Sequence, residues 1–123
     1  MNLHRSNTVV MWVVCAALVI ILPLKLNAHA VLMDSRPKIG SLVKGPDFPV
    51  WLRFNVRVDG SRSRCTLVLP NGSTEPLLLD PQSEPNILTA KATGLGAGKY
   101  KLQWQVLAAD GHITRGEFQL NIE

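Results

Sequence analysis

The sequence GKYKLQWQVLAADGHITRGEFQLNI, residues 98–122, contains two stretches in which apolar and polar residues alternate. Apolar side chains stand at every even position from 100 to 106 and again from 118 to 122. Because successive side chains of a β-strand point to opposite faces of its sheet, this period of two predicts two half-buried strands. The Asp110-Gly111 pair between them is a common turn signal, and a plain hairpin turn is its ordinary interpretation.

Five further segments have strand character, and Pro- and Gly-bearing turns separate them. Asn71-Gly72 tolerates positive φ and lies between two of these segments, which predicts another hairpin. Seven short strands in a chain of this length are typical of a β-sandwich. Besides the two strands above, the expected strands are His29–Met33, Val50–Val58, Cys65–Leu69, Glu75–Leu79 and Asn86–Thr93.

The only tyrosine of the chain, Tyr100, begins a predicted strand directly after the Gly-rich segment Leu95–Lys99. This placement resembles the tyrosine corner of Greek-key sandwiches, in which the hydroxyl binds a backbone group a few residues upstream. We therefore expect an all-β protein, a seven-stranded Greek-key sandwich or barrel, and a structural role for Tyr100.

The first residues indicate export. Met1–Asn7 carries a positive charge, and Val9–Leu22 is an unbroken apolar run, shorter than the roughly 20 residues of a membrane-spanning helix. Cleavage is plausible after Ala28 or, matching the A-x-A pattern more literally, after Ala30. An uncleaved signal anchor is the alternative. We expect a signal peptide at residues 1–28 and one domain at residues 29–123.

Composition excludes some classes of function. The chain has 13 Lys and Arg against 9 Asp and Glu, and Arg5 and Lys25 fall in the expected signal peptide. The small remaining excess is scattered, which argues against a nucleic-acid-binding protein. Of the two cysteines, Cys15 lies in the apolar run, so Cys65 has no partner in the exported domain and is expected to be a small buried hydrophobe.

Cleavage after Ala28 would make His29 the first residue, with a free amino group and an imidazole that can chelate one metal ion. The expected domain has one other histidine, His112, two residues after Asp110. In an extended segment residues two apart point to the same side, so Asp110 and His112 can face the same ion. The candidate metal ligands are therefore His29, Asp110 and His112.

An amine, two imidazoles and a carboxylate suit the tetragonal geometry of Cu(II), whereas zinc prefers a tetrahedral arrangement. Cu(I) prefers thioether or thiolate ligands, for which the expected domain offers only Met33 and Cys65. We expect one Cu(II) ion. Because an α-amino group has a pKa of about 7.7 to 8 and binds metal as the free base, affinity should fall as the pH falls.

Several motifs together resemble the CopC family of periplasmic copper-resistance proteins: His29–Leu32, Ser35–Gly40, Leu52–Phe54, Gly98–Val106 and Ala109–Phe118. The resemblance implies a cupredoxin-like or immunoglobulin-like β-barrel in the periplasm. It also implies that Cu(II) is bound through the processed N-terminal histidine and an Asp-x-His pair, here His29, Asp110 and His112.

The chain departs from the family pattern at three points, one of which is the arginine-rich segment Asn55–Arg64. Many members have an acidic residue where this chain has Asn55, and an amide is a weaker, neutral donor, so Asn55 is expected beside the ligands rather than among them. The Met-rich loop that some members use for Cu(I) is missing from this chain.

The function expected from these features is that of a non-enzymatic Cu(II) carrier or buffer for copper homeostasis or resistance. Its partners would be the copper ion and an inner-membrane copper transporter of the CopD type, with no nucleic acid and no small-molecule substrate. Two alternatives stay open. One is a copper-dependent oxidative enzyme with a histidine brace, and the other is a metal-free immunoglobulin-like interaction domain.

Overall fold

The alternating stretch at the C-terminal end forms the predicted hairpin, β7 (Gly98–Ala108) and β8 (Ile113–Ile122), in the computed structural model. The two strands pair antiparallel in an unbroken register from Gly98 opposite Ile122 to Leu107 opposite Ile113. The structure describes residues 29–123. The predicted signal peptide, residues 1–28, lies outside this part of the chain.

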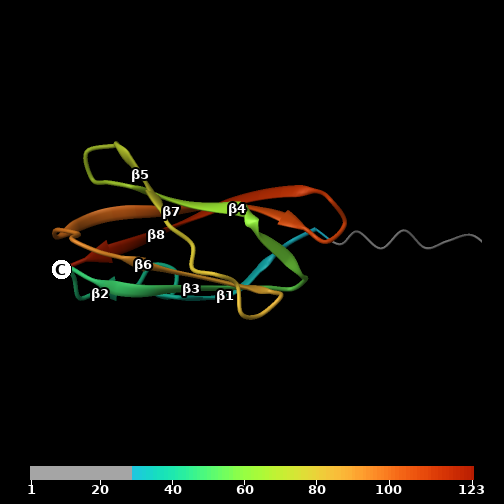
Figure 1. Ribbon diagram of the computed structural model, residues 1–123. Helices are drawn as coiled ribbons and strands as arrows, with labels where there is room; N and C mark the ends of the chain where they lie inside the picture. The colour runs from blue at the N-terminus through green and yellow to red at the C-terminus, as the bar shows by residue number, and fades with distance from the viewer. Residues whose placement is uncertain (1–28) are drawn as a thin grey trace, which may run out of the picture.

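Two sheets pack face to face (Figure 1). The remaining strands are β1 (Leu32–Arg36), β2 (Leu42–Val43), β3 (Phe48–Phe54), β4 (Val58–Val68), β5 (Thr74–Leu77) and β6 (Ile87–Ala92). One sheet has the order β1-β3-β6 and the other the order β2-β8-β7-β4-β5. The described residues contain no helix long and apolar enough to cross a membrane.

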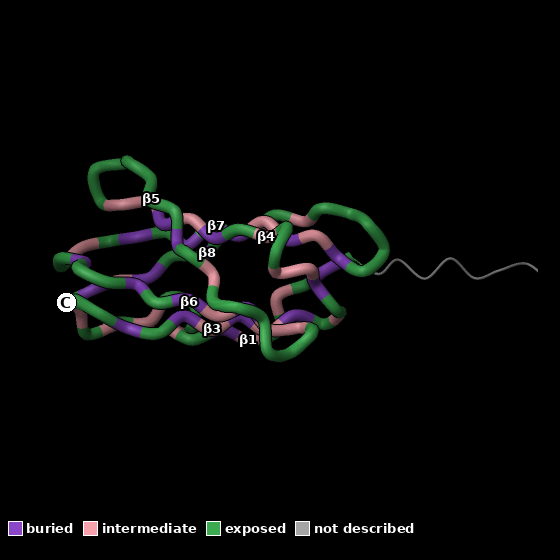
Figure 2. The backbone as a smooth tube through the Cα atoms, viewed as in Figure 1, coloured by how far each residue is buried: buried purple, intermediate pink, exposed green. Residues whose placement is uncertain are grey.

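The core lies between the sheets and is formed by apolar side chains of the alternating strands. Figure 2 colours the buried positions along these strands purple. Phe54 from β3 and Trp104 from β7 join the two sheets directly, because their ring centroids lie 5.3 Å apart in an edge-to-face arrangement. Cys65 is 1% exposed and belongs to this core. The predicted burial of the cysteine is therefore confirmed, as is the all-β sandwich.

The tyrosine corner is also present. The Tyr100 hydroxyl donates to the carbonyl oxygen of Gly96 at 2.8 Å, and the ring is buried. This bond fastens the start of β7 to the turn that precedes it. The structural role expected for Tyr100 is confirmed.

Strand boundaries differ from the prediction, and β4 (Val58–Val68) begins well before the predicted strand Cys65–Leu69. The stretch Val50–Val58 is not one strand: β3 ends at Phe54 and β4 begins at Val58. The alternating pattern predicted one strand because it continues into the connection between the two sheets. Val56 in this connection is partly buried against the core although it is not in a strand. The first strand begins at Leu32 rather than His29. An eighth strand, β2, has two residues paired parallel with β8, too few to give a sequence pattern.

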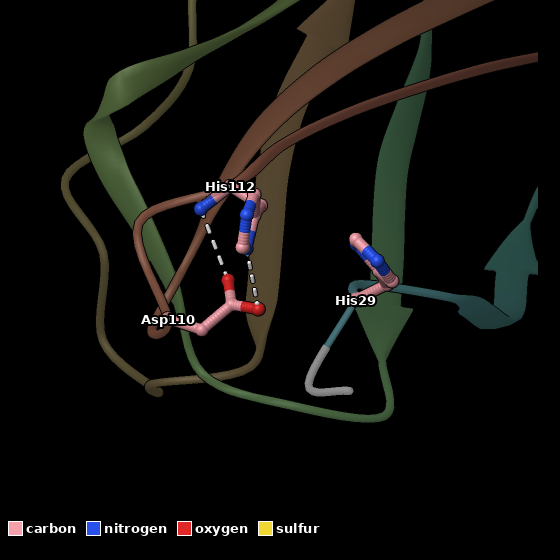
Figure 3. Close-up of side chains that lie close together, drawn as sticks. All are labelled: His29, Asp110 and His112. Atoms are coloured by element: carbon pink, nitrogen blue, oxygen red, sulfur yellow. Dashed lines mark hydrogen bonds and ion pairs between the residues drawn. The ribbon is translucent and has the colours of Figure 1, made fainter. Parts of the chain in front are cut away.

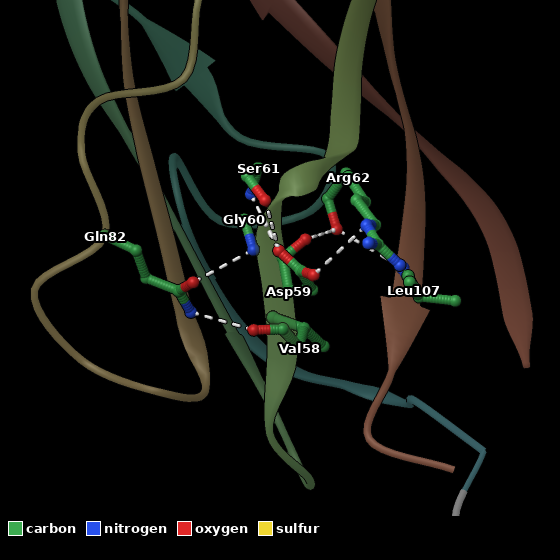
Figure 4. Close-up of polar contacts among 8 residues, drawn as sticks. Val58, Asp59, Gly60, Ser61, Arg62, Gln82 and Leu107 are labelled. Atoms are coloured by element: carbon green, nitrogen blue, oxygen red, sulfur yellow. Dashed lines mark hydrogen bonds and ion pairs between the residues drawn. The ribbon is translucent and has the colours of Figure 1, made fainter. Parts of the chain in front are cut away.

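An irregular stretch of β4 is held by a side chain from a neighbouring loop (Figure 4). The pairing register of β4 with β7 shifts between Asp59 and Arg64. Gln82 bridges this stretch: its Oε1 accepts the backbone N–H of Gly60 at 2.9 Å, and its Nε2 donates to the carbonyl oxygen of Val58 at 3.0 Å. This amide fastens the loop after β5 to β4, and the same loop and the β7–β8 turn line one open hollow.

Candidate metal centre

The three predicted ligands come together at one end of the sandwich (Figure 3). His29 precedes β1, whereas Asp110 and His112 belong to the turn between β7 and β8. Each residue offers one potential ligand atom, and these atoms all lie within 4.8 Å of one another. All three residues are exposed. Residues far apart in the sequence thus form one solvent-accessible cluster.

The turn that carries two of these residues is closed by backbone hydrogen bonds. The Ala108 N–H donates to the His112 carbonyl at 2.9 Å, and the Gly111 N–H donates to the Ala108 carbonyl at 3.0 Å. Gly111 has a φ of 85°, a conformation that a residue with a Cβ rarely adopts. The glycine lets the chain reverse tightly enough for Asp110 and His112 to lie side by side.

Asp110 is bound to His112 through both of its oxygens. Its Oδ1 accepts the backbone N–H of His112 at 3.0 Å, and its Oδ2 lies 2.9 Å from Nδ1 of the ring. These hydrogen bonds, the backbone one first, hold the pKa of the Asp110 carboxyl below its usual value, and the nearby His29 contributes in the same direction. The carboxylate is therefore ionised at neutral pH and orients the imidazole beside it.

The His29 ring faces the same space from the opposite sheet. Its centroid lies 5.3 Å from that of His112, with the two planes inclined at 54°. Next to it, Ala30 is only 2% exposed, so its methyl group packs into the core. The segment before β1 is thus anchored one residue away from a candidate ligand.

Asn55, which directly follows β3, binds this segment with its side chain and its backbone. Its Oδ1 accepts the Val31 N–H at 2.7 Å, and its Nδ2 donates to the His29 carbonyl at 3.3 Å. Its own N–H donates to the Val31 carbonyl at 3.0 Å. The sequence placed Asn55 beside the ligands rather than among them, but these particular contacts could not be anticipated from spacing.

The donor set fits a divalent copper ion by its chemistry. Two imidazoles and an ionised carboxylate are ligands that Cu(II) accepts, and their exposure leaves an entry path for the metal. Cys65 is not part of the cluster. Cys65 is buried, and this burial raises the pKa of its thiol to about 12, which disfavours a thiolate ligand. Met33 lies in β1 with an exposed side chain.

Comparisons with known proteins agree with the fold. The family model of the CopC domain matches residues 32–123. Protein YobA of Escherichia coli (strain K12) is 26% identical over 99 residues, which cover 78% of this chain and 80% of YobA. Protein YobA of Shigella flexneri matches to the same extent.

Two solved structures are similar over most of their length. CopC from Methylosinus trichosporium OB3b superposes with a TM-score of 0.69 at 28% identity, covering 77% of this chain and 94% of that protein. PcoC, a methionine-rich copper resistance protein from Escherichia coli, has a TM-score of 0.64 at 24% identity, covering 78% of this chain and all of that protein. The second likeness concerns the fold alone.

Proposed function

This chain belongs to the CopC family, and on that premise we propose that it is an exported Cu(II)-binding protein that carries or buffers copper. Membership of this family, whose resemblance implied copper resistance, supports a role connected with copper. The observation that carries the proposal is the cluster of His29, Asp110 and His112, whose potential ligand atoms lie within 4.8 Å of one another.

In the proposed site the ligands have separate roles. After removal of residues 1–28, His29 would supply both its imidazole and the new amino group, which together chelate the ion. His112 would add a second imidazole, and Asp110 would add a negative charge that offsets part of the charge of Cu(II). Three nitrogens and one oxygen form the set that a tetragonal Cu(II) ion prefers.

A carrier fits this arrangement better than an oxidative enzyme. An enzyme with a histidine brace needs open metal positions for its reactants, whereas the ionised Asp110 stands next to His112 and can take one of them. Exposure of all three residues also allows another protein to approach the ion and exchange ligands. We propose the periplasm as the compartment and an inner-membrane transporter of the CopD type as the partner.

The decisive experiment is the intact mass of the exported protein under native conditions with one equivalent of Cu(II). We expect a chain that begins at His29 and carries one copper ion. A chain that begins at Val31 would lack the amine and imidazole of His29 and would overturn the proposed chelate. A chain that begins at His29 but stays metal-free would overturn the copper function itself.

A further inference from the structure

We propose that Asn55 is a positioning residue that holds the segment 29–31 in place for copper binding, without being a ligand itself. The proposal rests on the function proposed above and concerns how the site is assembled. Its basis is the pair of hydrogen bonds that the Asn55 amide makes with the backbone on either side of Ala30.

The amide takes the place of a neighbouring strand at the point where regular pairing ends. The ladder between β1 and β3 includes Leu32 opposite Phe54 at this end, and residues before Leu32 lie outside β1. Beyond that point Asn55 accepts the N–H of Val31 and donates to the carbonyl of His29. The Val31 N–H and the His29 carbonyl therefore have partners although no strand continues beside them.

This location matters because the segment would supply two of the four copper ligands. Terminal residues fray unless they are tied down, and a frayed His29 would have to be ordered each time copper binds. Fixing the segment in the metal-free protein moves that entropic cost from binding to folding. The buried methyl of Ala30 adds a second point of attachment between the two hydrogen-bonded residues.

The choice of an amide over a carboxylate follows from the same contacts. Only an amide can both accept from Val31 and donate to the His29 carbonyl, because an ionised carboxylate has no hydrogen to give. Both polar atoms of the Asn55 side chain are therefore engaged by backbone. The side chain acts through His29, and Asp110 is left as the carboxylate of the cluster.

The first test compares Asn55→Ala with Asn71→Ala in exported protein whose mass confirms His29 as the first residue. Asn71 is a matched control, because its Oδ1 also accepts a backbone N–H, that of Ser73 at 2.9 Å, but in the β4–β5 turn. We expect Asn55→Ala to lower Cu(II) affinity by about 10- to 100-fold in a competition titration. Asn71→Ala should leave it unchanged, and equal affinity in both variants would overturn the proposal.

A spectroscopic readout separates positioning from direct ligation. At saturating copper the electron paramagnetic resonance spectrum of Asn55→Ala should match that of the wild type, because the same nitrogen and oxygen ligands surround the ion. A changed spectrum would mean that Asn55 touches copper and would overturn its assignment as a positioning residue.

A second variant removes the donor of one of these hydrogen bonds instead of its acceptor. Val31→Pro removes the N–H that Asn55 accepts and leaves the Asn55 side chain intact. If the two residues act as one unit, the affinity of the double variant should be close to that of Asn55→Ala alone. Fully additive losses would show that the two residues act independently, against the proposal.

Hydrogen exchange in metal-free protein tests whether Asn55 holds the segment 29–31, independently of whether the protein binds copper. The Val31 amide should exchange faster in Asn55→Ala than in the wild type, whether or not the protein binds copper. An unchanged exchange rate would overturn the proposal that Asn55 holds this segment. Absence of copper binding by the wild-type protein would instead overturn the proposed copper function.

Discussion

The carboxylate of Asp110 and the residue His112 are joined twice: Oδ1 accepts the backbone N–H of His112 at 3.0 Å, and Oδ2 lies 2.9 Å from ring atom Nδ1. The first bond shapes the turn and the second orients the imidazole. A two-residue spacing that is common in plain turns thus also builds half of the candidate metal centre.

Replacing His112 with Ala should weaken Cu(II) binding by more than roughly 100-fold. That is the upper range of the loss seen when a residue that only hydrogen-bonds to a metal ligand is changed. The melting temperature of the metal-free protein should hardly change, because the side chain is exposed. Chelator competition measures the affinity. Ile113→Ala, which trims the exposed neighbouring residue, is the control. Equal affinity in the two variants would contradict the assignment of His112.

Asp110→Asn should weaken Cu(II) binding throughout the range from pH 7 to pH 5. The hydrogen bonds from His112 hold the pKa of Asp110 below its usual value, so the wild-type carboxylate remains ionised throughout this range. Affinity of both proteins should fall as the pH falls, because protons compete with Cu(II) for its ligands. Parallel titrations at several pH values measure both affinities, and equal affinities of the two proteins at any pH in this range would contradict this account.

Cys65 should resist alkylation by iodoacetamide in the folded protein at pH 8 and react fully after denaturation. Burial raises the pKa of this thiol from 9.0 to about 12, and the thiolate is the reactive form. Mass spectrometry counts the modified chains. Rapid modification of the native protein would show that the core around Cys65 opens readily.

The same raised pKa predicts a loss of stability in alkali. The folded state keeps its Cys65 proton between pH 9 and pH 12, while the unfolded chain releases it. The stabilising contribution is therefore complete below pH 9 and declines as the pH rises towards 12. Thermal melts of the wild type should lose more stability over this range than those of Cys65→Ala, and parallel losses would contradict the prediction.

Gly116→Ala should destabilise the sandwich by about 1–3 kcal/mol, the usual cost of forcing extra volume into a packed region. A Cβ at Gly116 would collide with the Trp104 ring, whereas a Cβ at Gly96 would have nothing within 4 Å. Gly96→Ala is therefore the matched control. Chemical denaturation measures both, and equal stability of the two variants would show that Trp104 moves aside without cost.

Local pattern was sufficient for much of the fold. The alternation in β7 and β8 predicts their hairpin, because a sheet with one buried face imposes a period of two. It was not sufficient at Val56, where a connection between sheets buries an apolar side chain without being a strand. The two-residue strand β2 has no period to detect.

The candidate site was also only partly predictable from local sequence. His29, Asp110 and His112 could be proposed because chain end, residue type and spacing point to metal chemistry. The contacts of Asn55 with residues 24 and 26 positions away depend on how β3 ends beside the first segment, and no local motif encodes them. Gln82, which bridges Val58 and Gly60, was missed for the same reason.

The burial of Ala30 directly beside His29 has a practical consequence for anyone who prepares this protein. Because the core anchor begins at Ala30, a few leftover residues from an affinity tag in front of His29 would leave the sandwich folded. Those residues would nevertheless convert the α-amino group into an amide. A tagged preparation would pass every check of folding and still lack one donor of the proposed ligand set, so the proposed site is tested only on protein with a traceless N-terminus.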